Sequence, residues 1–138
     1  MTDAPAVMRP APIVTDDSEP FWTAALRGEL VIQRCSSCGR WNHPPRPMCP
    51  SCRSLGHEWV PVAGSGTVYS FGLLHHPQHP AFDYPVIAVL VELDERVRIV
   101  SNLVDVDPGE VAIGMPVEVT FAATARDQAV PVFRPRSA

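Results

Sequence analysis

All four cysteines of this 138-residue chain lie in one short stretch, RCSSCGRWNHPPRPMCPSCRS. They form two Cys-x-x-Cys pairs, Cys35 with Cys38 and Cys49 with Cys52, separated by ten residues. Such a pair turns backbone amides toward its sulfurs and supplies two of the four ligands of a tetrahedral metal ion. Gly39, directly after Cys38, allows the close backbone approach that this turn requires. The spacing therefore predicts a metal site with four thiolate ligands.

Two other states of these cysteines are possible, namely two disulfides or four free thiols. Disulfides are disfavoured because we expect a cytoplasmic chain without a leader sequence. Free thiols rarely occur at such paired spacing. Zinc is the favoured ion, although iron fits the same four ligands. Four thiolates leave no position for water, so we expect the metal to be structural and not catalytic.

A second group of chemically capable residues lies in LLHHPQHPAFDYP, which contains His75, His76 and His79 with Asp83 and Tyr84 nearby. This group suggests a second metal site or an acid–base cluster. The favoured interpretation is a proline-bounded loop between two strands. No other arrangement of residues resembles a known catalytic constellation.

Arginines are concentrated around the cysteines, where five Arg stand against a single Glu between residues 27 and 53. All eleven basic residues of the chain are Arg, which excludes chemistry that needs a lysine. The guanidinium group can form bidentate hydrogen bonds with phosphate oxygens, so this segment is a candidate site for a phosphorylated ligand. The alternative is an ordinary solvated surface. The candidate ligand-binding residues are Arg40, His43, Arg46 and Arg53.

The elements that would position these residues are short. Ser18 as N-cap and Gly28 as stop predict one helix, and ELVIQRC predicts a strand that leads into the cysteines. After residue 60 the apolar pattern changes to period two, with Gly64 and Gly66 turning the chain. Further strands are expected near residues 67–74, 85–94, 96–104, 115–121 and 130–135. Their number and size predict a small closed barrel of the OB type.

The predicted fold class is therefore mainly β, with an N-terminal helix and a zinc ribbon followed by a small OB-fold barrel. The predicted divisions are a flexible or strap-like tail over residues 1–17, the helix and ribbon over 18–62, and the barrel over 63–138. No apolar run approaches the ~20 residues that span a membrane. We therefore expect a soluble, cytoplasmic protein that does not contact a membrane.

Ribbons and OB barrels also bind nucleic acids, which gives the alternative function class. A net charge of −4, the absence of Lys and an aromatic content of 7% weigh against it. A third class is an independent enzyme that uses the histidine loop.

The order of these segments resembles a known family. FWTAALRGELVIQRC, CSSCGRWNHPPRPMCPSC, GSGTVYSF, YPVIAVLVELDERVRIVSNLVD, IGMPVEVTF and PVFRP follow one another between about residues 18 and 135. This order is similar to that of the rubredoxin-like zinc-ribbon plus OB-fold proteins that accompany thiolase-superfamily enzymes, including thiolase-like steroid side-chain aldolases.

The resemblance implies a noncatalytic accessory subunit of an acyl-CoA complex. Its partner would be a thiolase-like or lipid-transfer-protein-like subunit that carries out the retro-aldol cleavage, so the chain would function in a hetero-oligomer. The four cysteines correspond to the family's metal ligands, and no catalytic residue carries over. The arginines on the ribbon would then help to hold the phosphates of coenzyme A.

Overall fold

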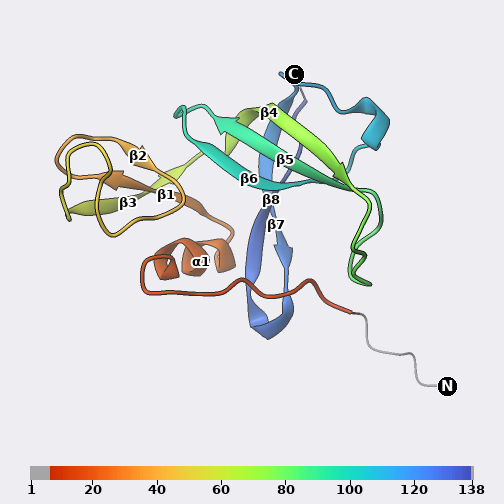
Figure 1. Ribbon diagram of the computed structural model, residues 1–138, viewed down its shortest axis with the longest axis horizontal. Helices are drawn as coiled ribbons and strands as arrows, with labels where there is room; N and C mark the ends of the chain where they lie inside the picture. Colours follow the sequence, from red (N-terminus) through yellow and green to blue (C-terminus); the bar gives the residue numbers. More distant parts are fainter. Residues whose placement is uncertain (1–6, 138) are drawn as a thin grey trace.

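The computed structural model describes residues 7–137, which form one helix, a small sheet and a barrel (Figure 1). The elements, in chain order, are α1 (Glu19–Leu26), β1 (Leu30–Cys35), β2 (Trp41–Asn42), β3 (His57–Val62), β4 (Ser65–Leu74), β5 (Val86–Leu93), β6 (Arg98–Leu103), η1 (Pro108–Glu110), β7 (Pro116–Ala123), η2 (Ala125–Asp127) and β8 (Ala129–Pro135). No helix among residues 7–137 is long and apolar enough to cross a bilayer.

The helix α1 begins and ends where its sequence signals predict. Ser18 is the N-cap and Pro20 lies in the first turn, where its missing N–H costs no hydrogen bond. At the other end Gly28 adopts a φ of +76°, and its amide donates to the Ala25 carbonyl at 3.0 Å. This left-handed residue ends the helix and directs the chain into β1.

The ribbon sheet has the antiparallel order β2-β1-β3. Its central strand β1 is almost completely buried, and Leu30 and Ile32 are 3% and 0% exposed. These side chains join the same apolar core as the barrel strands. The ribbon is therefore packed against the barrel and is not a separate appendage.

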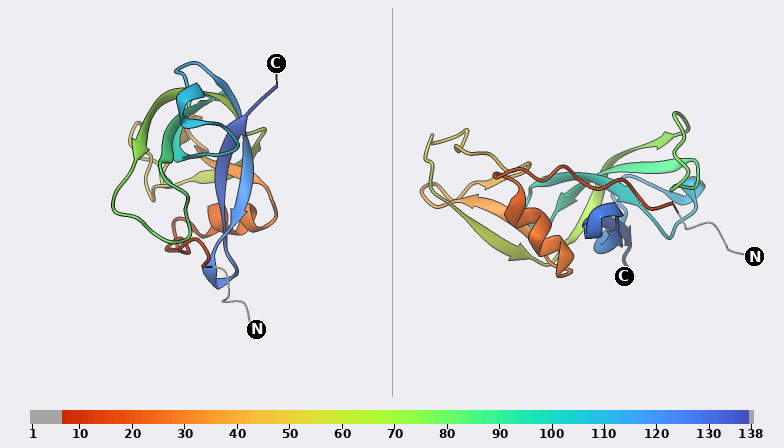
Figure 2. Two further views of the ribbon diagram at one scale, coloured as in Figure 1. Left: turned by 90° about the vertical axis from the view of Figure 1, so that its right-hand side faces the viewer. Right: turned by 90° about the horizontal axis from the view of Figure 1, so that it is seen from below.

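The second unit is a closed barrel of order β4-β5-β6-β8-β7, which confirms the predicted OB type. Every second residue of β5 is buried, from Ile87 to Leu93, because one face of the strand lines the barrel interior. Phe133 of β8 is 0% exposed and fills the core beside Leu103 of β6, its parallel pairing partner. Two further views show the ribbon and α1 at one end of this barrel (Figure 2).

The link from ribbon to barrel depends on two glycines. Gly64 has a φ of +79°, and an added Cβ would collide with the side chain of Val119. Gly66 lies so close to β5 that an added Cβ would collide with the carbonyl oxygen of Glu92. Both positions therefore require glycine, one for conformation and one for close approach of two backbones.

The N-terminal segment lies along α1 and the barrel from residue 7 onward (Figure 2), while residues 1–6 of the predicted tail lie outside the described part. Arg9 donates from Nη1 to Asn102 Oδ1 at 3.1 Å, and its guanidinium lies 4.8 Å from the ring centroid of Phe82. Its carbonyl accepts from the Ala125 amide at 2.8 Å. The division into residues 1–17, 18–62 and 63–138 stays a prediction.

Candidate metal centre and adjoining ligand clefts

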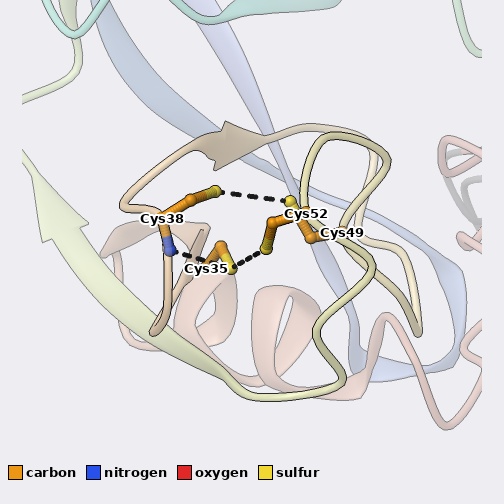
Figure 3. A group of neighbouring side chains, drawn as sticks. All are labelled: Cys35, Cys38, Cys49 and Cys52. Carbon is orange, nitrogen blue, oxygen red and sulfur yellow. Dashed lines mark hydrogen bonds between the residues drawn. The ribbon is translucent and has the colours of Figure 1, made fainter.

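The four cysteine side chains converge from the two loops of the ribbon (Figure 3). Their sulfur atoms all lie within 4.8 Å of one another. Cys35 Sγ lies 3.4 Å from Cys52 Sγ, and Cys38 Sγ lies 3.7 Å from Cys49 Sγ. Four sulfurs bonded at ~2.3 Å to one tetrahedral zinc ion would be about 3.8 Å apart. The donor set therefore fits a tetrahedral metal ion.

The sulfur separations also exclude the disulfide alternative, because a disulfide bond joins its sulfurs at about 2.05 Å. None of the four cysteines forms a disulfide. Cys35 and Cys49 are buried, whereas Cys38 and Cys52 are exposed, so the centre lies at the edge of the ribbon.

Backbone amides stabilise the thiolate form of the two buried cysteines. The Cys38 amide lies 3.5 Å from Cys35 Sγ and lowers the pKa of the Cys35 thiol. A hydrogen bond from the Cys52 backbone is the largest cause that lowers the pKa of Cys49 to about 6. Because thiolates are the metal-binding form, these backbone amides favour metal binding by Cys35 and Cys49.

A cleft of about 420 Å³ separates the ribbon from the β5–β6 hairpin. Four arginines line it, two from the ribbon (Arg40 and Arg46) and two from the hairpin (Arg96 and Arg98). One carboxylate, Glu95, lines the cleft as well, so positive charge dominates. Arg96 and Arg98 were not among the predicted ligand-binding residues, because they lie far from the cysteines in the chain.

Several contacts hold these arginines in place. The buried amide of Gln33 makes two hydrogen bonds with the backbone of Arg46, at 2.8 and 2.9 Å. Arg98 pairs with Glu92 at 3.3 Å, and its guanidinium carbon lies 3.7 Å from the ring centroid of Tyr69. Arg40, exposed to solvent, donates to the hydroxyl of Ser51.

A second, largely apolar groove of about 520 Å³ lies on the other side of His43. The groove is lined by α1, β6, β8 and the N-terminal segment, and His43 borders both the groove and the arginine cleft. The imidazole packs against Phe21, with ring centroids 5.2 Å apart. Burial lowers the pKa of His43 to about 4, so the ring is neutral at physiological pH.

The structure brings three of the four predicted ligand-binding residues, Arg40, His43 and Arg46, into one cleft. Arg53 does not line it and instead adopts a left-handed φ of +66° after the second cysteine pair. Arg53 could therefore act on a ligand in the cleft only through its positive charge, and not by direct contact.

The histidines of the 75–85 loop do not form a metal-binding group. His79 Nδ1 accepts a hydrogen bond from the Ala81 amide at 3.1 Å, and the His79 amide donates to the Tyr84 hydroxyl. His75 and His76 are exposed. Within residues 7–137, the four cysteines are the one cluster with metal-binding geometry. The loop interpretation is thus the one that the geometry favours.

A zinc ribbon with four thiolates, joined to an OB barrel, defines a class of two-part proteins. Two family models match the chain: the ChsH2 rubredoxin-like zinc ribbon domain over residues 22–58 and the ChsH2 C-terminal OB-fold domain over residues 59–122. The chain belongs to the ChsH2 family of zinc-ribbon and OB-fold proteins, which includes DUF35 scaffold proteins. The four cysteines accordingly form a structural zinc site.

Several proteins are similar to this chain in sequence. A probable enoyl-CoA hydratase alpha subunit from Thermomonospora curvata is 44% identical over 95% of this chain. A 3-oxo-4,17-pregnadiene-20-carboxyl-CoA hydratase alpha subunit from Mycobacterium tuberculosis is 40% identical over 86% of it. The chain spans 41% and 37% of the lengths of these two relatives.

Two further similarities involve proteins of comparable length. A DUF35 domain-containing scaffold protein from Methanocaldococcus jannaschii is 35% identical, over 71% of each chain. A solved chain described as Ltp2-ChsH2(DUF35) aldolase superimposes with a TM-score of 0.85 at 44% identity. That match covers 90% of this chain and 98% of the solved one, so the fold is shared over almost its whole length.

Proposed function

We propose that this chain is a noncatalytic accessory subunit of a thiolase-superfamily acyl-CoA complex, of the kind that cleaves steroid side-chain CoA esters by a retro-aldol reaction. The observation that carries the proposal is the similarity to the solved Ltp2-ChsH2(DUF35) aldolase, at 44% identity over nearly the whole of both chains. In this proposal a thiolase-like partner subunit performs the C–C cleavage in the cytoplasm.

The chemistry of the metal centre supports an accessory role. Four thiolates saturate a tetrahedral zinc ion, which leaves no position to activate water or polarise a carbonyl. The metal would instead hold the two ribbon loops together. Because Gln33 on β1 binds the backbone of Arg46 in the segment between the two cysteine pairs, an ordered ribbon also fixes one wall of the arginine cleft.

The two depressions beside His43 suit an acyl-CoA. Coenzyme A carries its negative charge on phosphates at one end, whereas the acyl group at the other end is apolar. The cleft lined by Arg40, Arg46, Arg96 and Arg98 matches the anionic end, since guanidinium groups bind phosphate oxygens with paired N–H donors. The groove beside Phe21 and Val132 offers the apolar surface that an acyl group requires.

The test is co-expression with a thiolase-like subunit, most simply one encoded beside this chain. The expected result is a complex that co-purifies and cleaves a steroid side-chain CoA ester, whereas this chain alone shows no turnover. Catalysis by the isolated chain would contradict the proposal. Binding of single-stranded DNA at physiological salt would support the nucleic-acid alternative instead.

A further inference from the structure

The strand β4 is paired along only part of one edge. It pairs with β5 as far as Leu74, but with β7 only over Ser65–Thr67. Val68 continues the contact on the β7 side, since its amide donates to Met115 O at 3.0 Å and its carbonyl accepts from Gly114 N at 2.8 Å. Beyond Val68, no strand of residues 7–137 pairs with this edge.

The unpaired edge also leaves part of the barrel interior uncovered. Phe71 lies opposite Val89 and Leu73 lies opposite Ile87, and both of these β5 residues are buried. Directly opposite residues share a face of a sheet, so Phe71 and Leu73 face the core side. They are nevertheless 37% and 41% exposed. The barrel wall is therefore open next to residues 70–74, which we call the β4 edge.

The chemistry of the β4 edge specifies its occupant. An unpaired strand edge presents N–H and C=O groups that another strand satisfies best. In natural proteins, unpaired sheet edges are usually protected by charged side chains or by Pro. The segment from Ser65 to Leu74 carries no charged side chain and no Pro. Ile113, 71% exposed and adjacent to the Gly114–Val68 hydrogen bond, extends the apolar surface. The complementary segment is an uncharged extended strand with apolar side chains at alternate positions.

The size of the β4 edge distinguishes between a second copy of this chain and a larger partner. Stable interfaces bury about 20–30 residues on each side. Five strand residues and Ile113 are far fewer, so a dimer formed through this edge alone would be weak. A larger partner can add the strand to a wider contact surface. This step rests on the proposed function, which supplies such a partner.

We propose that the thiolase-like partner subunit donates an extended, uncharged segment to the β4 edge. Its main chain would continue the sheet beyond Val68, and one of its apolar side chains would cover Phe71 and Leu73. The strand addition would thus complete the barrel wall.

The experiment compares two Lys substitutions of exposed leucines, Leu73→Lys at the edge and Leu55→Lys in the ribbon loop, where Leu55 is 72% exposed. Both variants are checked for wild-type circular dichroism and for one zinc per chain. We expect Leu73→Lys to weaken association with the partner at least tenfold, while Leu55→Lys binds like wild type. We also expect hydrogen exchange in residues 70–74 of the wild-type chain to slow in the complex.

Each other outcome counts against strand addition. If the wild-type pair forms but Leu73→Lys binds normally and exchange in residues 70–74 is unchanged, the β4 edge is not the docking site and the accessory function stands. If no wild-type pair forms, both proposals fail. If the isolated wild-type chain forms a dimer that Leu73→Lys disrupts, a second copy occupies the edge and the heterologous strand is overturned.

Discussion

Gln33 and Arg46 are joined by a reciprocal pair of hydrogen bonds across the ribbon. Gln33 Nε2 donates to the Arg46 carbonyl at 2.8 Å, and the Arg46 amide donates to Gln33 Oε1 at 2.9 Å. Gln33 is only 2% exposed, so its side-chain amide depends on these two bonds in place of water. The pair ties the loop between the two cysteine pairs to the central strand β1.

We expect Gln33→Ala to lower the free energy of unfolding by about 2 kcal/mol, because it removes two hydrogen bonds that contribute about 1 kcal/mol each. Urea denaturation measures this loss. Gln78→Ala is the matched control, since Gln78 is exposed, and its effect should stay within about 0.5 kcal/mol. Equal stability of Gln33→Ala and wild type would show that the reciprocal bonds do not hold the loop.

Substitution of one zinc ligand should remove the metal. For Cys49→Ser we expect elemental analysis to fall from about one zinc per chain to about zero, with a markedly lower melting temperature, since metal binding and ribbon folding are coupled. Ser37→Ala, a change within the first cysteine pair, should keep its zinc. A wild-type chain that folds without any bound metal and with four freely titratable thiols would contradict the structural role.

The neutral state of His43 should make stability depend on pH. Burial lowers its pKa in the folded state to about 4 from 6.5, so the unfolded chain binds more protons between these values and stability falls as the pH drops. Between pH 7.5 and 5 the wild type should lose about 2 kcal/mol that His43→Gln does not lose. Urea unfolding of both proteins at each pH gives this difference, and parallel curves would show that His43 is not shielded from solvent.

Within β4, the close approach of the β5 backbone should make Gly66 hard to replace. Gly66→Ala would force a Cβ against the Glu92 carbonyl, whereas Gly72→Ala meets nothing within 4 Å. We expect the first to destabilise the protein by at least ~2 kcal/mol and the second by less than ~0.5 kcal/mol. Thermal unfolding of the two variants tests this contrast, and equal melting temperatures would contradict it.

The hairpin arginine Arg96 should contribute to binding of coenzyme A. Arg96→Ala removes one guanidinium from the cleft, and we expect an affinity about fivefold lower by calorimetry, equivalent to about 1 kcal/mol. The loss should shrink as salt is added, because exposed charges are screened. Arg134→Ala, which removes an exposed arginine paired with Glu118 on the barrel, is the control and should bind like wild type. If Arg96→Ala binds coenzyme A as tightly as wild type does, the cleft is not the coenzyme A site.

Local features could be predicted from the sequence because they depend on short stretches of chain. Two Cys-x-x-Cys pairs specify a four-thiolate site whatever surrounds them, and Pro20 and Gly28 mark the ends of α1 through their own backbone preferences. The barrel strands could be predicted from period-two apolar patterns and from the turn residues between them, and the number of strands predicted the OB type.

The positions that only the tertiary structure decided depend on contacts between distant segments. Arg96 and Arg98 line the same cleft as Arg40 and Arg46 because the β5–β6 hairpin lies beside the ribbon, and no local pattern encodes that packing. The alternating pattern of β4 predicts that Phe71 is buried in the core. Phe71 is exposed because β7 stops pairing with β4 at Thr67 and leaves that part of the barrel uncovered. Spacing along the chain thus determined the metal site, whereas the ligand cleft and the open barrel edge arise from how the two units pack and pair.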